Sequence, residues 1–146
     1  MKDINGKEIK TGDIVEIRGA YFKTDNHLWL VDRCPGDPSW TGKDLGLRKI
    51  SKTGKLASEH NVGFWPIFVT VSSREKRAAA YEWNEKNAVI EIVEIPNMAE
   101  VKAHFEEEAK SNEERAEYMF WRGWSDDTIQ LHKTIAKYFR GVAERI

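Results

Sequence analysis

The sequence predicts an α+β fold in which a β-rich part precedes a helical part. The first 72 residues contain short apolar runs separated by turn residues, a spacing typical of a small antiparallel barrel or curled sheet. After residue 72 the apolar residues recur mainly with helical period. We therefore expect a small antiparallel SH3-like barrel or curled sheet with one packed helix in residues 1–96. A C-terminal antiparallel helical hairpin in residues 97–146 would pack on it or form an oligomer interface.

The strands are predicted from period-two patterns that follow turns. In Ile14–Arg18 apolar Val15 and Ile17 alternate with polar residues, as in a half-buried strand. Pro66 removes a backbone donor from the most apolar run, so that strand should lie at a sheet edge or bend. The turn before Ile14 resembles the start of an SH3-like barrel. The expected strands are 14–18, 27–31, 45–50, 55–57 and 64–71, with a hairpin turn at 52–54.

A helix and a returning strand follow. Ser72 and Glu75 fit a capping box that starts a helix at Arg74 and carries it to about Lys86. Trp83 is expected to pin this helix to the sheet. The β-branched run 88–95, which ends at a proline, predicts a strand that returns to the sheet.

Two helices are predicted to close the chain. Asn97 can cap the first, Gly123 can end it, and Ser125 can cap the second. The second helix carries a broad apolar face that must be buried. The apolar positions are Met98, Val101, Phe105, Ala109, Ala116 and Met119 in the first helix, and Ile129, Leu131, His132, Ile135, Ala136, Tyr138, Phe139, Val142, Ala143 and Ile146 in the second.

Composition limits the classes of function. The 146 residues carry a net charge of −1, so no overall field attracts nucleic acid or a membrane surface. Residues 43–77 are locally basic, with a formal charge of +5 from eight basic and three acidic residues. One cysteine, Cys34, permits no internal disulfide, and neither a secretory signal nor an apolar span is visible. We expect a cytoplasmic protein with no membrane partner.

No motif for catalysis or metal binding is recognised. The segment Gly36–Lys43 resembles a P-loop, but five residues separate its glycines where four are required, and Asp44 follows the lysine. The four histidines form no pair at helical spacing, and His104 and His132 are expected to be hydrogen-bonded structural residues. We expect no enzyme activity, no metal and no cofactor.

The loop 34–43 is the main candidate site because it places a large aromatic, Trp40, in a polar connection. In one interpretation Trp40 stacks on a base while basic side chains hold the phosphates. In the other, Trp40 folds back over the end of the barrel, and polar loop residues make local turn bonds. The candidate ligand-binding residues are Asp37, Ser39, Trp40, Lys43, Arg48, Lys49 and Trp65.

Four segments, namely 3–9, 36–40, 47–54 and 64–66, together resemble a family of small proteins encoded by phages and mobile elements of gut bacteria. That family has no assigned activity or catalytic residue. The resemblance implies an accessory binding protein in an anti-defence role, whose partner is a host defence protein or a small anionic nucleotide signal. Two alternatives stay open: a nucleic-acid-binding module that uses the basic segment 43–77, and a structural protein that forms homo-oligomers through its C-terminal helices.

Overall fold

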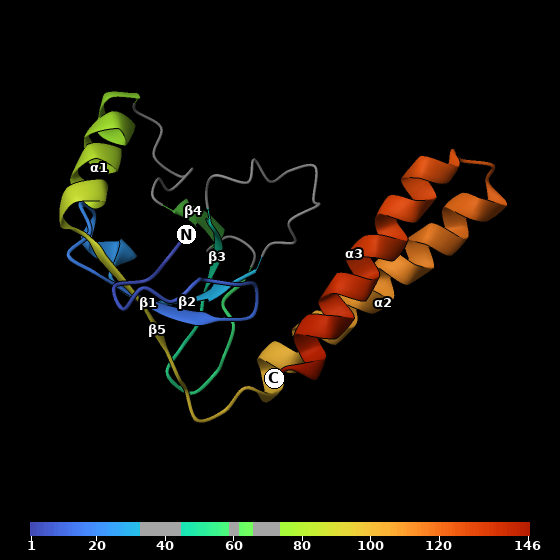
Figure 1. Ribbon diagram of the computed structural model, residues 1–146, viewed down its shortest axis with the longest axis horizontal. Coiled ribbons are helices and arrows are strands. Elements are labelled where there is room, and N and C mark those ends of the chain that lie inside the picture. Colours follow the sequence, from blue (N-terminus) through green and yellow to red (C-terminus); the bar gives the residue numbers. More distant parts are fainter. Residues whose placement is uncertain (33–44, 59–61, 66–73) are drawn as a thin grey trace.

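The structure, a computed structural model, describes residues 1–32, 45–58, 62–65 and 74–146. The strands and α1 gather at one end, and α2 and α3 form an arm that projects away from them (Figure 1). The elements are β1 (Ile14–Arg18), the 3-10 turn η1 (Lys23–Asp25), β2 (Leu28–Val31), β3 (Leu45–Lys49), β4 (Val62–Trp65), α1 (Arg74–Asn87), β5 (Val89–Val93), α2 (Ala99–Trp121) and α3 (Asp126–Glu144).

The described strands form one antiparallel sheet of five strands in the order β4-β3-β2-β1-β5. The α+β class is therefore confirmed, and β4 lies at an edge as predicted. Among the described residues the sheet is open, with β4 and β5 at opposite edges, so it is not closed into a barrel. The expected strand 55–57 shrinks to a single bridge between Ile50 and Leu56.

The two faces of the sheet belong to different hydrophobic clusters. Leu28 and Leu30 of β2 pack in the cluster that includes the hairpin, whereas Trp29 and Val31 pack in a second cluster on the opposite face. Successive side chains of a strand point to opposite faces. Since β2 is buried on both faces, it is the central strand around which the fold is organised.

The N-terminal loop covers the edge of β5. The Ile4 amide donates to the Ile90 carbonyl, and the Ile92 amide donates to the carboxylate of Asp3. Burial by itself would raise the pKa of Asp3, but this amide and two amides of the loop itself hold it below the ordinary value. The loop thus satisfies backbone groups that an edge strand would otherwise present to other chains.

Helix α1 is held to the loop after β1 by two side chains. Asn84 is buried and accepts the Tyr21 amide, while the indole N–H of Trp83 donates to the Gly19 carbonyl. Trp83 nevertheless leaves about half of its side chain exposed (47%). Trp83 therefore ties α1 to the loop after β1 through this hydrogen bond, while the buried positions of α1 are Ala80 and Asn84, one turn apart.

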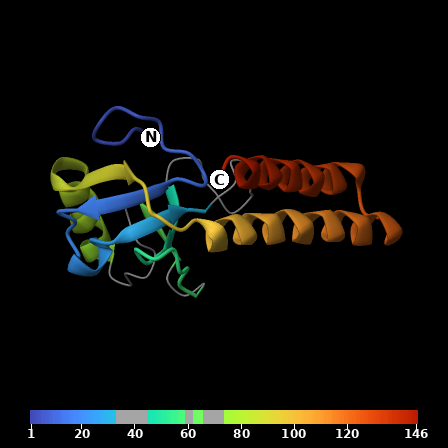
Figure 2. The same ribbon diagram turned by 90° about the horizontal axis from the view of Figure 1, so that it is seen from below.

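The helical hairpin forms as predicted: α2 and α3 lie side by side over their length (Figure 2). Asn97 accepts the Ala99 amide at the start of α2. Ser125 stands at the N-cap of α3, but its hydroxyl bonds to the Thr128 hydroxyl and not to an amide. The buried positions are Val101, Phe105, Ala109 and Ala116 of α2 and Ile129, Ile135, Ala136, Phe139, Val142 and Ala143 of α3, all within the predicted set.

Candidate interaction surface at the tip of the helical hairpin

Most of the predicted ligand site lies outside the described residues. This applies to Cys34 and the whole loop 34–43, and so to Asp37, Ser39, Trp40 and Lys43. Trp65 is the last residue of β4, where it pairs with Leu45. Of the predicted set, only Arg48 and Lys49 have described side chains, both in β3.

Arg48 is engaged in a polar cluster between the sheet and the hairpin. His104 Nε2 lies 2.6 Å from a carboxylate oxygen of Asp32, and Arg48 Nη1 lies 3.4 Å from His104 Nδ1. Arg48 Nε also donates to the Ala57 carbonyl at 3.0 Å. The three side chains are only 13–14% exposed. This Asp32–Arg48–His104 cluster therefore joins β2 and β3 to α2, and the guanidinium of Arg48 is already surrounded by internal partners.

Lys49 lies on the other side of the sheet from Arg48. Its ammonium nitrogen stands 5.7 Å from the ring centroid of Trp29, its cross-strand partner. Arg48 pairs instead with Leu30, which faces the hairpin. Because consecutive strand residues alternate between faces, the structure does not bring these two predicted phosphate-binding residues together.

Asp25 is a buried carboxyl that the sequence patterns do not reveal. It ends η1 and is 6% exposed, and no group in the described part of the chain hydrogen-bonds to its Oδ2. Burial raises the pKa of Asp25 to about 6, and the positive charge of Lys49 offsets only part of this effect. The site is thus a local cost to stability at neutral pH.

The second predicted structural histidine lies inside the hairpin. His132 of α3 is paired with Asn112 of α2, with 3.0 Å between Nδ1 and Oδ1, so the ring nitrogen is assigned as the donor. Burial, together with the charge of Arg115, lowers the pKa of His132. The prediction that His104 and His132 are hydrogen-bonded structural residues is confirmed. In the described ranges, no three potential metal-ligating side chains gather.

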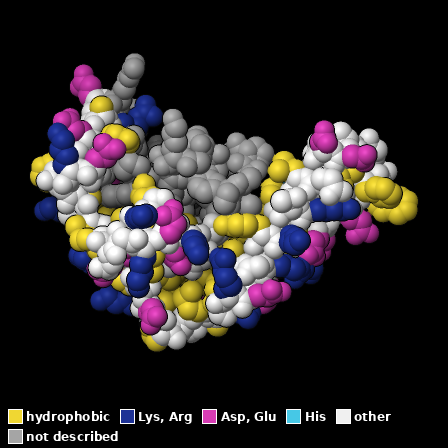
Figure 3. All heavy atoms as spheres, viewed as in Figure 1, with side chains coloured by type: hydrophobic (Ala, Val, Ile, Leu, Met, Phe, Trp, Pro, Cys, Tyr) yellow, Lys and Arg dark blue, Asp and Glu magenta, His cyan; other side chains and the backbone are white. Residues whose placement is uncertain are grey.

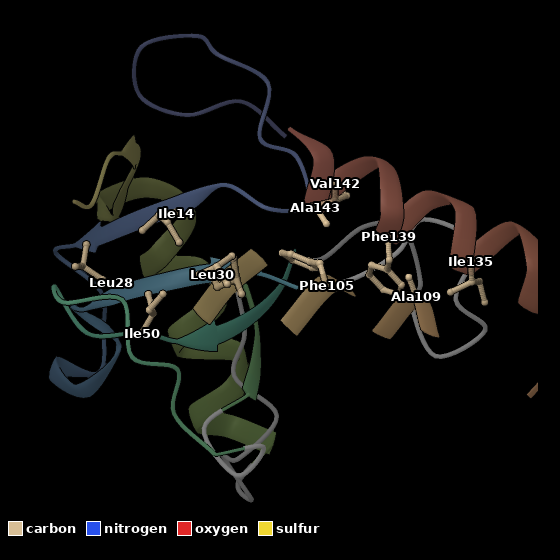
Figure 4. Packing of buried hydrophobic residues seen from close by; sticks show 11 residues of the cluster. Ile14, Leu28, Leu30, Ile50, Phe105, Ala109, Ile135, Phe139, Val142 and Ala143 are labelled. Atoms are coloured by element: carbon tan, nitrogen blue, oxygen red, sulfur yellow. The ribbon is translucent and has the colours of Figure 1, made fainter. Parts of the chain in front are cut away.

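The hairpin is rooted in the sheet by one continuous core. Phe105 is fully buried between Leu30 of the sheet and Phe139 of α3, with 5.8 Å between the two phenyl centroids (Figure 4). At the turn after β3, Gly54 has φ +86°, and a Cβ there would stand 2.1 Å from the Asn97 carbonyl oxygen just before α2. We call this part of the hairpin, next to the sheet, the root.

At the opposite end, the turn between α2 and α3 is closed by a Schellman motif. The Trp124 amide donates to the Met119 carbonyl, and the Gly123 amide donates to the Phe120 carbonyl. Gly123 has φ +71°, which a residue with a Cβ rarely adopts, so the predicted helix stop is confirmed. The turn therefore fixes Trp124 against the last turn of α2.

Four aromatic side chains around this turn are exposed. Tyr118 is 55% exposed, Phe120 64%, Trp121 77% and Trp124 53%. Within the group, the rings of Phe120 and Trp121 meet edge to face at 5.7 Å, and the Arg122 guanidinium lies 5.2 Å from the centre of the Tyr118 ring. Figure 3 shows hydrophobic side chains gathered at this far end of the arm. We call these four residues the tip cluster.

The four side chains of the tip cluster together expose about as much apolar area as the largest patch of a typical single chain. An aromatic side chain offers about 150–250 Å², so four that are a little over half exposed present on the order of 500 Å². The largest apolar patch of a typical monomer is about 300–600 Å² and is often functional. The arm as a whole shows no such exposure at its root, where Val101 and Phe105 are completely buried.

The sequence patterns missed this cluster, although a signal was present. The buried stripe of α2 runs through Phe105, Ala109 and Ala116 at helical spacing. Tyr118 and Trp121 do not continue that spacing, so they fall outside the face that packs on α3. Phe120 keeps the spacing of the stripe but is still exposed in the last turn of α2, so the signal was the pair Tyr118 and Trp121, which leave the buried stripe beside a glycine stop.

One cleft lies where the sheet meets the C-terminal end of α3. It has a volume of about 440 Å³ and is lined by apolar side chains such as Ile95, Met98 and Val142, with Asp13 and Arg145 among its polar neighbours. Arg145 donates to the Thr11 carbonyl at 3.2 Å, so it ties the chain end to the sheet. The cleft therefore lies at the junction between the sheet and the helical hairpin.

Comparison with known proteins finds no match for this chain. No protein-family model, no curated protein and no solved structure matches the chain. Among the described helices, none combines the length and apolar character needed to cross a membrane. The function is therefore inferred from the physical properties of the tip cluster.

Proposed function

We propose that this chain is a non-enzymatic binding protein that docks onto another protein through the tip cluster. The observation that carries the proposal is the exposure of four aromatic side chains around a turn whose backbone is fixed by hydrogen bonds. Exposed aromatic area is unfavourable in water, and these side chains contribute little to the core. A binding partner that covers them would recover that free energy.

The composition of the tip favours a protein partner. Trp, Tyr and Arg are the residues that most often dominate the binding energy of protein interfaces. The tip supplies Trp121, Trp124, Tyr118 and Arg122 within seven residues. A patch on the order of 500 Å² is smaller than the roughly 800 Å² that each partner contributes to a standard interface, so the cluster would act as the anchor of a somewhat larger contact.

The contacts at the root hold the tip cluster in a defined position for binding. The shared core and the Asp32–Arg48–His104 cluster hold the arm against the sheet, which reduces the entropy lost when the tip binds. The resemblance to proteins of phages and mobile elements supports a host protein as the partner, with an anti-defence role as its setting. The nucleotide-binding version of the site involves the loop 34–43 and stays a prediction.

A photo-crosslinking experiment tests this proposal. A benzophenone amino acid replaces Phe120 in the full chain, expressed in the cells that naturally make it or encounter it, and the control replaces Ser111, which is exposed further back on α2. We expect a discrete adduct with a different protein from position 120, absent from position 111. The adduct should disappear when Trp121→Ala and Trp124→Ala are added. Adducts only with lipid, only with a second copy, or equal at both positions would contradict the proposal.

A further inference from the structure

The charges around the tip cluster constrain the chemistry of its partner. Between Glu113 and Asp127 the chain carries five acidic residues and two basic ones, a formal charge of −3. The dipoles of the two helices add little, because α2 ends and α3 begins at the tip, and their partial charges of about −0.5 and +0.5 oppose each other. The electrostatic character of the tip is therefore set by its side chains.

Arg122 is directed to a contact within the arm, whereas Arg115 is exposed. The Arg122 guanidinium lies on the ring of Tyr118, and Arg115 lies close enough to His132 to lower its pKa. Of the acids, Glu113 is neutralised by a bidentate pair with Arg140, with distances of 2.5 and 2.7 Å. Within the described part of the chain, the other four acids have no ion pair as close as that between Glu113 and Arg140. These acids are Glu114, Glu117, Asp126 and Asp127.

These four acids border the aromatic side chains. Glu114 and Glu117 precede Tyr118 and Trp121 respectively by four residues, so each lies on the same helical face as an aromatic ring. Glu114 reaches Lys110 only at 4.0 Å, between two largely exposed side chains, which contributes little. Asp126 and Asp127 are exposed in the first turn of α3, directly after Trp124. Figure 3 shows acidic side chains beside the hydrophobic ones at this end.

From this arrangement, and resting on the proposed function of the tip, we infer that the partner is a protein whose docking surface is an apolar cleft bordered by Lys and Arg side chains. Complementary charge around an apolar centre guides association and selects among partners. The same acids disfavour other occupants. An anionic bilayer and nucleic acid would repel them. A second copy of the tip would place like charges against each other.

Selection from a random peptide library displayed on phage tests the inference while the partner is still unidentified. The full-length wild-type chain is the bait, compared with three variants. Trp121→Ala/Trp124→Ala removes the largest rings, and Glu114→Lys/Glu117→Lys reverses the border at the end of α2, where lysine suits the helix dipole. Glu85→Lys/Glu107→Lys makes the same change of charge at two exposed positions away from the tip, one in α1 and one in the middle of α2.

We expect the wild type to enrich peptides that combine aliphatic residues with Lys or Arg. The tryptophan variant should enrich none of them. The Glu114→Lys/Glu117→Lys variant should bind a selected peptide at least about tenfold more weakly, a change of about 1.4 kcal/mol, and should enrich acidic peptides in its own selection. The Glu85→Lys/Glu107→Lys control should bind within about twofold of the wild type, since distant exposed charges are screened.

The outcomes separate the inference from the proposed function. Peptides that need the tryptophans but show no basic bias, or an acidic bias, would overturn the inference and leave the docking role intact. Failure to enrich any peptide that depends on the tryptophans would count against both. Tryptophan-dependent sedimentation with vesicles of phosphatidylcholine and phosphatidylglycerol would assign the tip to a bilayer. A tryptophan-dependent dimer in solution would assign it to a second copy. Either result would overturn the inference.

Discussion

Aromatic side chains are buried at the root of the helical hairpin and exposed at its tip. At the root, Phe105 and Phe139 are buried between the sheet and the two helices. At the tip, Phe120 and Trp121 of the same helix α2 are more than 60% exposed. Folding explains the aromatics at the root, because their burial stabilises the chain, but it does not explain the aromatics at the tip. The difference supports the proposal that the tip cluster serves an interaction and not the core.

The charged groups show the same contrast. The sheet end buries Asp25 and encloses Asp32 between basic partners. The tip leaves Glu117, Asp126 and Asp127 in water. Burial makes a carboxyl costly or strongly dependent on its partners, whereas an exposed one is nearly neutral for stability. The free energy of unfolding should therefore respond to mutation at the sheet end and not at the tip.

The largest expected difference comes from one substitution made at both ends of α2. Phe105→Ala should lower the free energy of unfolding by about 3–5 kcal/mol, because it leaves a cavity in the shared core. Phe120→Ala, on the exposed tip, should change it by less than about 0.5 kcal/mol. Urea denaturation followed by circular dichroism measures both. Equal losses at the two positions would remove the distinction between root and tip.

A pH titration sharpens the contrast between buried and exposed carboxyls. The pKa of Asp25 is raised from 3.8 to about 6 in the folded state, so the folded chain binds more protons than the unfolded chain between these values. The contribution of Asp25 to stability should thus decline as pH rises from about 4 to 7, by at most about 3 kcal/mol. Asp25→Asn should abolish this decline and make the chain more stable than wild type at pH 7.

The matched control for that titration is Asp127→Asn at the tip. This variant should follow the wild-type dependence of unfolding free energy on pH, since Asp127 is exposed. A wild-type chain that gains stability relative to Asp25→Asn as the pH rises from 4 to 7 would show that the buried carboxyl is stabilised in its charged form, contrary to this account.

A smaller loss of stability is expected when the polar contact between the sheet and the hairpin is removed. Asp32→Ala removes the acceptor 2.6 Å from His104 Nε2 and should lower the free energy of unfolding by about 1–3 kcal/mol, since the histidine loses a largely buried partner. Glu107→Ala, an exposed change on α2, the helix that carries His104, should have almost no effect. If the two variants unfold at the same urea concentration, the Asp32–Arg48–His104 cluster does not stabilise the root.

The smallest expected effect on stability is also the most informative about function. Trp121→Ala/Trp124→Ala should lower the free energy of unfolding by at most about 1 kcal/mol, because Trp121 is 77% exposed and Trp124 is about half exposed. The same variant should lose the crosslinked partner and the selected peptides. A loss of several kcal/mol in denaturation would show instead that the rings stabilise the arm.

Local patterns predicted much of this fold. The alternation in Ile14–Arg18 and the helical spacing from Val101 to Ala116 depend only on neighbours along the chain, and both elements appear with the expected buried faces. Whether the sheet closes into a barrel or stays open could not be predicted in this way. The answer depends on contacts between distant segments, and a turn pattern in the first 20 residues carries no information about them.

The candidate site was less predictable, for two physical reasons. Arg48 and Lys49 are neighbours in sequence but occupy opposite faces of a strand, so a basic stretch does not imply one basic surface. The exposure of Trp121 was not predicted because an apolar residue near a helix end is ordinarily assigned to the core. Only the packing of α2 on α3 shows which aromatics the hairpin covers and which it leaves exposed.

The most direct test of the central claim is hydroxyl-radical footprinting of the tryptophans, both in the purified chain and in the cells where it acts. Trp121 is 77% exposed and Trp29 is 4% exposed, so Trp121 should be oxidised many times faster than Trp29 in the purified chain. In the cell, Trp121 and Trp124 should become protected while Trp29 is unchanged. Slow oxidation of Trp121 in the purified chain, or equally fast oxidation in the cell, would contradict the assignment of the tip as a docking surface.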